Sequence, residues 1–253
     1  MNSRSFSPIP PRWTLDGTIL IVTSIFAHRG HHVAYAENSV AAVAAAAQIG
    51  ADGVEIDVWL TSDKHLIVNH DRVVARRPIP STPSAMITAL KPLATLEDVL
   101  FAAGDLRVNV EIKATRSTSY NTAVARAVSD FLDSSPASAQ CLVSSFSLAI
   151  CDEVRRLSAQ RRVGWLVEHR PHRSVLDEVA NSGLTSAHLA FSRVNAAVVE
   201  RAESLGVELH VWTPNLRRDL DRMMDLGVGA LITDDVVLAL ELREDRRRTS
   251  TPG

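Results

Sequence analysis

The sequence has few of the features that mark thiolate-bound metal, membrane-spanning helices or nucleic-acid binding. It contains only two cysteines, Cys141 and Cys151, and their spacing of ten fits no metal-binding pattern, so buried, reduced thiols are expected. No apolar run reaches the roughly 20 residues that a membrane-spanning helix requires. The net charge of −2 supplies no overall field that would attract nucleic acid or an anionic membrane. We therefore predict a protein with no nucleic-acid partner and no stable membrane insertion.

The beginning of the chain also lacks the pattern of a signal peptide. The apolar run 18–27 follows an acidic residue and several prolines instead of a basic start, and it leads directly into His28-Arg29-Gly30. We interpret this run as the first strand and predict a cytoplasmic location. The composition of residues 1–14 predicts a flexible N-terminal tail, and that of residues 243–253 a disordered C-terminal tail. One folded domain would then occupy residues 15–242.

Apolar runs and helical patterns alternate along this domain. Strands are predicted at 18–27, 53–60, 107–113, 141–146, 162–167, 187–191, 208–212 and 230–233, with a short extension at 66–69. Helical patterns lie at 39–49, from 95 onward, and at 120–132, 148–159, 174–180, 195–205 and 216–226. Alternation of this kind indicates parallel α/β architecture, and eight main strands in a chain of about 250 residues predict a (β/α)8 TIM barrel. Residues 72–92 show no clear period and are predicted to form a short cap or loop insertion after the second strand.

A doubly wound sheet is the structural alternative. It would require a glycine-rich turn of the G-x-G-x-x-G kind after the first strand. The corresponding segment reads His28-Arg29-Gly30-His31-His32, which does not fit. The barrel is therefore favoured.

Acidic side chains gather at the ends of two predicted strands. Glu55 and Asp57 are two residues apart in a strand, so both carboxylates face the same side. Glu111 and Lys113 repeat this spacing in the next main strand. In a barrel, inward-facing groups at the carboxyl ends of strands meet at the catalytic face. Three carboxylates that converge there would repel one another without a cation, and their all-oxygen donor set favours Mg²⁺ or Ca²⁺ over Zn²⁺.

Two histidines and two cations accompany these acids. His28 and His70 each end a strand, and one can accept a proton while the other donates one. Arg29 and Lys113 suit a phosphate group, although both could instead pair with the nearby carboxylates. This combination is typical of a phosphoryl-transfer centre.

The segments around these residues resemble the glycerophosphodiester phosphodiesterase family. The similarity runs through residues 26–234 in family order. It rests on His28-Arg29-Gly30, Glu37-Asn38-Ser39, Gly50-Ala51-Asp52, Glu55-Ile56-Asp57-Val58, His70-Asp71, Glu111-Ile112-Lys113, Ser144-Ser145-Phe146, Val211-Trp212-Thr213-Pro214-Asn215 and the segment 227–234 that ends in Thr233-Asp234. The chain departs from the family at Lys64, at residues 73–78, in the short interval 71–111 and at Val236. These departures bear on the alcohol group that is recognised.

The resemblance implies a metal-dependent hydrolysis of glycerophosphodiesters to sn-glycerol 3-phosphate and an alcohol. It implies that Glu55, Asp57 and Glu111 hold the metal, with Mg²⁺ or Ca²⁺ usual, and that His28 and His70 form the general acid/base pair. Arg29, Asn38 and Lys113 would contact the phosphate or position the site. Trp212 would line the glycerol end of the pocket, although a tryptophan at an inward position can also be plain core.

Three other functions remain open at this point. A phospholipase D-type enzyme acting on lysophospholipids could use the same barrel and would need an apolar mouth. A barrel that only binds would be expected to have lost a histidine or a metal carboxylate, and all five are present. A lyase or aldolase would need a Schiff-base lysine, for which Lys113 is the only well-placed candidate.

Overall fold

The computed structural model describes residues 12–15 and 18–249, and in this part of the chain eight parallel strands close into a barrel. Around the barrel the strands follow the order β3, β13, β12, β11, β10, β9, β8, β4, and pairing of β3 with β4 closes it. The strands are β3 Ser24–His28, β4 Gly53–Leu60, β8 Arg107–Ile112, β9 Cys141–Ser145, β10 Arg162–Val167, β11 Ser186–Ala190, β12 Glu208–Trp212 and β13 Ala230–Thr233. The predicted (β/α)8 barrel is confirmed.

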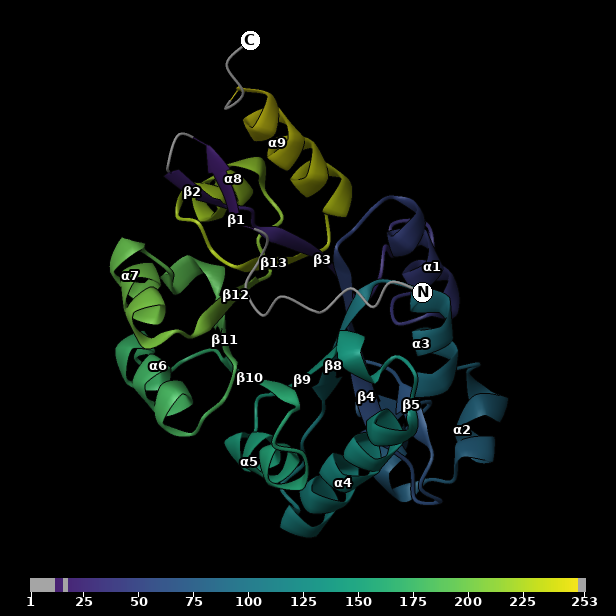
Figure 1. Ribbon diagram of the computed structural model, residues 1–253. Coiled ribbons are helices and arrows are strands. Elements are labelled where there is room, and N and C mark those ends of the chain that lie inside the picture. Colours follow the sequence, from purple (N-terminus) through teal and green to yellow (C-terminus); the bar gives the residue numbers. More distant parts are fainter. Residues whose placement is uncertain (1–11, 16–17, 250–253) are drawn as a thin grey trace.

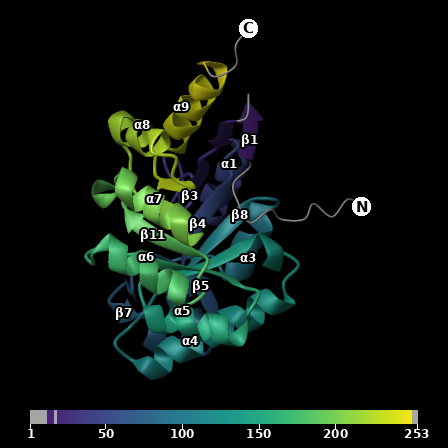
Figure 2. The ribbon, with the colours of Figure 1, turned by 60° about the vertical axis from the view of Figure 1, so that its left-hand side comes forward.

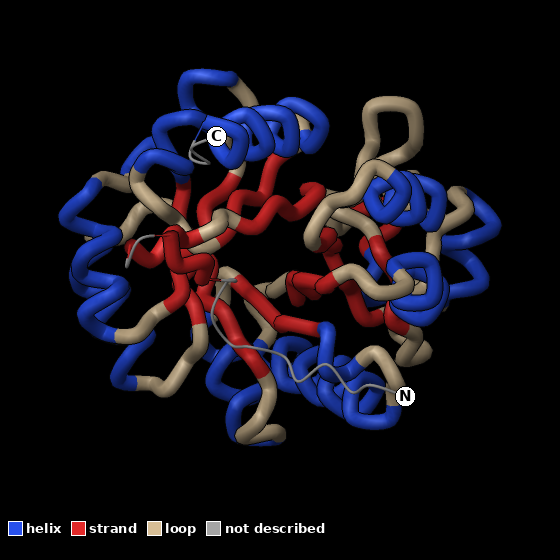
Figure 3. Tube along the Cα trace, turned by 45° about the horizontal axis from the view of Figure 1, so that its top comes forward, coloured by secondary structure: helices blue, strands red, loops and turns tan. Residues whose placement is uncertain are grey.

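Helices surround the strands on the outside, as the tube view and the turned ribbon show (Figures 2 and 3). They are α1 Val40–Gln48, α3 Leu96–Ala103, α4 Thr118–Ser134, α5 Leu148–Leu157, α6 His172–Asn181, α7 Ala196–Leu205, α8 Arg217–Asp225 and α9 Val236–Thr249. Each follows one barrel strand, so the loops after the strands collect at the carboxyl end of the barrel (Figure 1).

Alternation along β4 separates residues that pack under the helices from residues that face the barrel interior. In β4 every residue is buried, but Val54, Ile56 and Val58 belong to the large hydrophobic core under the helices. The residues between them point into the barrel because successive side chains of a strand face opposite sides. Glu55 and Asp57 are therefore directed to the interior by the strand itself.

Several segments at the edges differ from the predictions. The predicted strand 18–27 is two strands, β2 Thr18–Ile21, which pairs with β1 Arg12–Leu15 in a hairpin, and β3 of the barrel. Residues 12–14, predicted as tail, therefore belong to a strand, and residues 1–11 lie outside the described part. The predicted C-terminal tail is also wrong up to Thr249, because α9 extends that far; residues 250–253 lie outside the described part.

The insertion after β4 is more ordered than the predicted loop. The chain first returns along β4 as β5 Leu66–Val68, which runs antiparallel to it. The segment 72–92 then contains β6 Val73–Val74, β7 Arg77–Pro78, a 3₁₀ turn Ile79–Ser81 and helix α2 Ser84–Leu90. A small cluster of buried apolar residues lies under it: Trp59, Ile67, Val74, Ile79 and Ile87. This insertion therefore forms a small packed cap beside the end of β4.

Two further expectations concern the thiols and the membrane. Cys141 and Cys151 are free and buried, as predicted. Among the helices of the described residues, none combines the length and apolar character that crossing a bilayer demands.

Candidate active site

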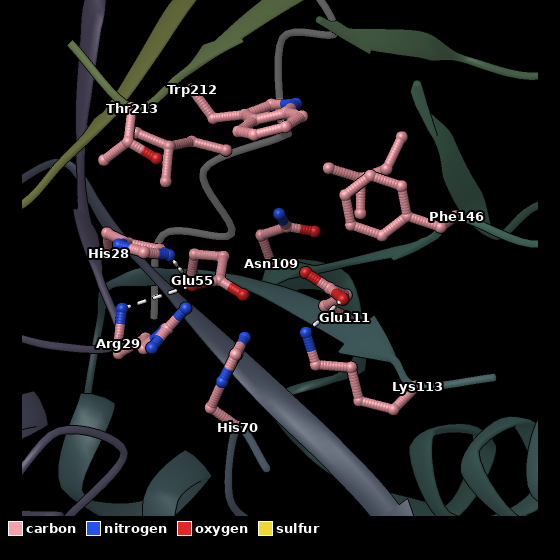
Figure 4. A pocket seen from close by; sticks show the side chains of 12 residues that line it. His28, Arg29, Glu55, His70, Asn109, Glu111, Lys113, Phe146, Trp212 and Thr213 are labelled. Atoms are coloured by element: carbon pink, nitrogen blue, oxygen red, sulfur yellow. Dashed lines mark hydrogen bonds and ion pairs between the residues drawn. The ribbon is translucent and has the colours of Figure 1, made fainter. Parts of the chain in front are cut away.

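Three carboxylates converge where β4 and β8 end. Asp57 lies beside Glu111 in the register of these parallel strands, and Glu55 is two residues before Asp57 on the same face. One oxygen from each of the three groups lies within 4.8 Å of the others, and all three residues are buried. Sequence spacing predicted this cluster, and the structure brings its members together (Figure 4, in which Glu55 and Glu111 are labelled).

Lys113 and Arg29 offset part of this negative charge. The Lys113 Nζ atom lies 2.6 Å from Asp57 Oδ1 and 2.5 Å from Glu111 Oε1. Arg29 Nε lies 3.4 Å from Asp57 Oδ2, while its Nη1 donates to Glu37 Oε2 at 2.8 Å. Both cations thus pair with carboxylates, which the sequence left open, and both also line the cavity.

The three carboxylates differ in pKa because their surroundings differ. Burial raises the pKa of Glu55 well above its usual value, and the charges of Asp57 and Glu111 add to this effect. Burial likewise raises the pKa of Glu111 to about 7, against the opposing charge of Lys113. For Asp57, burial acts in the same direction, but the contacts of Lys113, Asn38 and Arg29 outweigh it and lower its pKa. Lys113 and Arg29 therefore do not fully offset the negative charge of the three carboxylates.

The cluster has the composition of a site for a hard divalent cation. Glu55 Oε2 accepts from the backbone N–H of Arg29 at 3.2 Å, but Glu55 Oε1 is buried with no hydrogen-bond partner in the described structure. A buried carboxylate oxygen without a donor is costly unless a cation reaches it. Oxygen-only donors suit Mg²⁺, Ca²⁺ or Mn²⁺. The residues present therefore fit a divalent metal ion.

Asn38 supports the cluster from behind the cavity. Its Nδ2 donates to Asp57 Oδ2 at 2.7 Å, and its Oδ1 accepts from the Asp57 backbone N–H at 3.1 Å. The residue adopts a φ of +59°, a conformation that asparagine tolerates better than most residues. These two contacts orient the Asp57 carboxylate, and Asn38 is not among the residues that line the cavity.

Each candidate histidine is held by a carboxylate. His28 Nδ1 lies 2.6 Å from Asp234 Oδ1, and His70 Nδ1 lies 3.0 Å from Asp71 Oδ1. Because a carboxylate only accepts, the proton is assigned to Nδ1 in both rings, which leaves Nε2 without a proton in the neutral ring. Both residues line the same cavity (Figure 4).

Asp234 is a site residue to which sequence reasoning assigned no role. Its other oxygen accepts from Asn215 Nδ2 at 2.6 Å, and Asn215 Oδ1 accepts from the Asp234 backbone N–H at 2.9 Å. Burial acts to raise the pKa of Asp234, but the contacts with His28 and Asn215 lower it, so it is a charged partner for the imidazole. Its place directly after the last barrel strand is the signal that could have identified it.

The cavity itself has a volume of about 160 Å³. Its lining includes charged residues and the apolar residues Phe146, Leu166, Trp212 and Ile232, and Figure 4 shows Trp212 and Phe146 on the side away from Arg29 and His70. Trp212, predicted at the glycerol end, packs edge-to-face against Phe146 with ring centroids 5.7 Å apart. The Trp212 Nε1 atom donates to the His188 backbone oxygen at 3.1 Å, which fixes the ring. Phe146 belongs to a segment noted in the sequence but was not predicted as a site residue.

With this geometry established, comparison with known proteins decides the family. Residues 28–238 match the model of the glycerophosphoryl diester phosphodiesterase family. The chain belongs to this family. It is thereby an enzyme of the phosphodiesterase class, as the sequence motifs indicated.

Several members of the family resemble this chain along nearly its whole length. The glycerophosphodiester phosphodiesterase of Caldanaerobacter subterraneus subsp. tengcongensis is 28% identical over 237 residues, which cover 84% of this chain and 94% of that protein. A crystal structure of a glycerophosphodiester phosphodiesterase from Parabacteroides distasonis superposes with a TM-score of 0.83 at 26% identity, covering 89% of this chain and 98% of the other. An Oleispira antarctica phosphodiesterase, solved in complex with the product sn-glycerol-3-phosphate, has a TM-score of 0.77 at 20% identity and covers 87% of this chain and 97% of its own. This last likeness concerns the fold.

Proposed function

We propose that the protein hydrolyses glycerophosphodiesters to sn-glycerol 3-phosphate and an alcohol, with a divalent metal ion and two histidines. The observation that carries the proposal is a cluster of three buried carboxylates, two of which, Glu55 and Glu111, line the same cavity as the two carboxylate-held histidines. Membership of the phosphodiesterase family supports the same reaction. The small cavity agrees with a small-molecule substrate.

The side chains suggest how the proton transfers are divided. The Nε2 atom of one histidine accepts the proton of the attacking hydroxyl, which belongs to water or to the substrate. As the attacking oxygen bonds to phosphorus and the bond from phosphorus to the leaving oxygen breaks, the other histidine, which starts as imidazolium, donates its Nε2 proton to the leaving oxygen. If a substrate hydroxyl attacks, the cyclic phosphodiester that forms is then opened by water with the two histidine roles exchanged. Asp234 and Asp71 accept from the Nδ1–H groups of His28 and His70, so Nε2 is the atom of each ring that exchanges a proton. Arg29 and Lys113 stabilise the charge on the non-bridging oxygens.

Glu55, Asp57 and Glu111 would hold the metal ion, with Mg²⁺ or Ca²⁺ proposed. When bound, such an ion supplies Lewis-acid stabilisation of the negative charge on the phosphoryl oxygens. The chain's own contribution is to place three oxygen ligands together and to hold Asp57 through Asn38.

Lysophospholipids are a second candidate substrate class, and one observation favours them. Large apolar side chains are exposed on loops that follow barrel strands, namely Val33, Tyr35, Phe146 and Leu216. Phe146 also lines the cavity, so apolar surface continues from the pocket to solvent. An acyl chain could pack there while the phosphodiester occupies the charged part.

The predicted cytoplasmic location stays a prediction.

The test compares glycerophosphocholine with lysophosphatidylcholine as substrates, with Mg²⁺ or Ca²⁺ supplied. We expect sn-glycerol 3-phosphate from the first and, if the apolar mouth is used, lysophosphatidic acid from the second. His28→Ala should lower turnover by roughly 10²- to 10⁴-fold, because an acid/base group is lost. His169→Ala serves as the matched control, since the His169 side chain is exposed and pairs with Glu168, outside the residues that line the cavity. Failure of the wild type to cleave either lipid derivative would refute the proposed function.

A further inference from the structure

Asn109 carries a buried side-chain amide at this site, and the amide has no hydrogen-bond partner among the described residues. It lies on β8, two residues before Glu111 and beside Glu55 in the register of β4 and β8, so its side chain faces the barrel interior. The residue is 0% exposed, and neither Nδ2 nor Oδ1 makes a hydrogen bond within the described structure. It also lines the catalytic cavity, and Figure 4 shows its amide between the carboxylates of Glu55 and Glu111 and the rings of Trp212 and Phe146.

An unpartnered buried amide of this kind calls for an explanation. Buried polar groups in folded proteins are nearly always hydrogen-bonded, and leaving both ends of an amide unpaired destabilises the fold. The strand fixes the inward direction of Asn109, and the cavity is the space that its side chain borders. A group that enters the cavity is therefore the partner that the amide lacks.

The chemistry of the amide indicates the kind of group. The NH₂ of Asn109 donates and its oxygen accepts, whereas a phosphate diester oxygen can only accept. A hydroxyl can do both. The other residues of the cavity also differ in the group that they suit. His28, Arg29 and Lys113 suit the anionic phosphate. Figure 4 shows Asn109 on the side of the aromatic rings of Trp212 and Phe146. A polyol whose CH groups contact aromatic rings and whose hydroxyl contacts an amide fits that part.

We propose that Asn109 binds a hydroxyl of the glycerol moiety and so selects glycerol-bearing phosphoesters over simple alkyl ones. The inference rests on the proposed function, because it names a specificity residue of that same site. Trp212 and Phe146 supply the apolar contact, and Asn109 supplies the polar contact that an alkyl chain cannot use. A site built to pair with a hydroxyl rejects an analogue without one, since the amide is then buried unpaired.

The experiment measures competitive inhibition by two small phosphomonoesters, sn-glycerol 3-phosphate and n-propyl phosphate. They share the phosphate and the three-carbon chain, and they differ in the hydroxyl groups. For the wild type we expect roughly tenfold tighter inhibition by sn-glycerol 3-phosphate. In Asn109→Leu this ratio should fall toward one, while the inhibition constant of n-propyl phosphate changes by less than about twofold. Asn109→Ala replaces the leucine variant if circular dichroism shows that the latter does not fold.

Ser144→Ala is the matched control. Ser144 lies on the neighbouring strand β9 beside Glu111, and its buried hydroxyl also has no hydrogen-bond partner among the described residues, but it does not line the cavity. Its variant should keep the wild-type ratio. If the Asn109 variants weaken both inhibitors equally or keep the ratio, the inference is wrong although the enzyme is active. If the wild type neither hydrolyses glycerophosphodiesters nor binds either phosphomonoester, the proposed function fails instead.

Discussion

Asp234 holds the ring of His28 by its Nδ1 atom, and we expect this contact to matter for the proposed catalysis. The two atoms are 2.6 Å apart, and Asn215 orients the second oxygen of the carboxylate. Asp234→Asn keeps the shape but can present an NH₂ group to Nδ1, which disfavours the tautomer with a free Nε2. We predict a fall in kcat of roughly 10²-fold with little change in KM, measured by steady-state kinetics.

Asp235→Asn provides the control for that substitution. The Asp235 side chain accepts from the Leu238 backbone N–H at 3.1 Å, at the start of α9, and makes no hydrogen bond or ion pair with His28 in the described structure. Its variant should lower the melting temperature slightly and leave kcat nearly unchanged. Equal losses of kcat in both variants would contradict an orienting role for Asp234.

Residue spacing was enough to predict the cluster of carboxylates but not the residues that hold these carboxylates in place. Glu55 and Asp57 share a face because strands have a period of two, and that rule needs no knowledge of the fold. Arg29 and Asn38 adopt positive φ in the segment after β3. The contact of Asn38 with Asp57 depends on this loop conformation. Contacts of this kind depend on loop conformation, which the sequence does not specify locally.

Among the helices and strands, α9 differs most from the prediction, and its ion pairs explain why the segment after residue 242 is helical. Composition predicted disorder after residue 242, because a charged segment buries little apolar surface. Yet Arg246 pairs with Asp221 at 2.6 Å and with Asp225 at 2.9 Å, both on α8, and Arg243 pairs with Asp52. These partners lie 21 to 191 residues away, so no local pattern reveals them.

The stability of this helix can be tested with two arginines of the same segment. Arg246→Ala removes both contacts with α8 and should lower the free energy of unfolding by about 1 kcal/mol, measured by urea titration. Arg248→Ala removes only a pair with Glu244 within the helix, at 3.4 Å, and should change stability by less than about 0.5 kcal/mol. A larger loss for Arg248→Ala would argue against docking of α9 through Arg246.

The N-cap of α3 allows a prediction for an element that the sequence identified correctly. Thr95 Oγ1 accepts from the Asp98 backbone N–H at 3.1 Å, and Asp98 reaches back to the Thr95 N–H at 2.9 Å. Thr95→Ala should destabilise the protein by about 1 kcal/mol, with kcat/KM preserved because the cap lies outside the cavity. Thr88→Ala is a suitable comparison, since the Thr88 hydroxyl contacts only carbonyls within α2. A loss of activity without a loss of stability would be inconsistent with a capping role.

For the whole molecule, part of the barrel interior holds buried histidines where many barrels have branched aliphatic side chains. His188 and His210 stack with ring centroids 4.4 Å apart, and Gly164 leaves room for His188, since a Cβ there would lie 2.3 Å from its Nε2. Burial lowers the pKa of His188 well below its usual value, with the charges of His210 and Arg162 adding to this. Burial also lowers the pKa of His210, against the effect of Glu208.

This buried pair predicts loss of stability in mild acid. In the unfolded chain each histidine takes up a proton below pH about 6.5, whereas the folded state resists protonation. Their contribution is therefore complete above that pH and decreases as the pH falls. We expect the free energy of unfolding, measured with a metal chelator present, to fall from pH 7.5 to pH 5.5 by a larger amount in the wild type than in His188→Gln. His169→Gln, at an exposed position, should follow the wild type, and parallel curves for all three proteins would contradict the prediction.

The fold class was predictable because alternation of strands and helices is a property of the whole chain. A short cap or loop insertion was predicted at residues 72–92, but its strands and helix were not, because β6 and β7 are two residues long and carry no periodicity. Exposure of Val73, Met86 and Leu90 on this cap depends on the final packing and could not be read from composition.

The most direct test of the account measures sn-glycerol 3-phosphate released from glycerophosphocholine by protein that has first been treated with a chelator. The account predicts no release until Mg²⁺ or Ca²⁺ is added, and recovery with either or both ions. Glu55→Gln, which keeps the shape but removes the charge of the carboxylate with the unpartnered oxygen, should stay at least roughly 100-fold less active at the same cation concentration. Full activity in the chelator, or a Glu55→Gln variant as active as the wild type, would contradict a metal-dependent phosphodiesterase centred on these carboxylates.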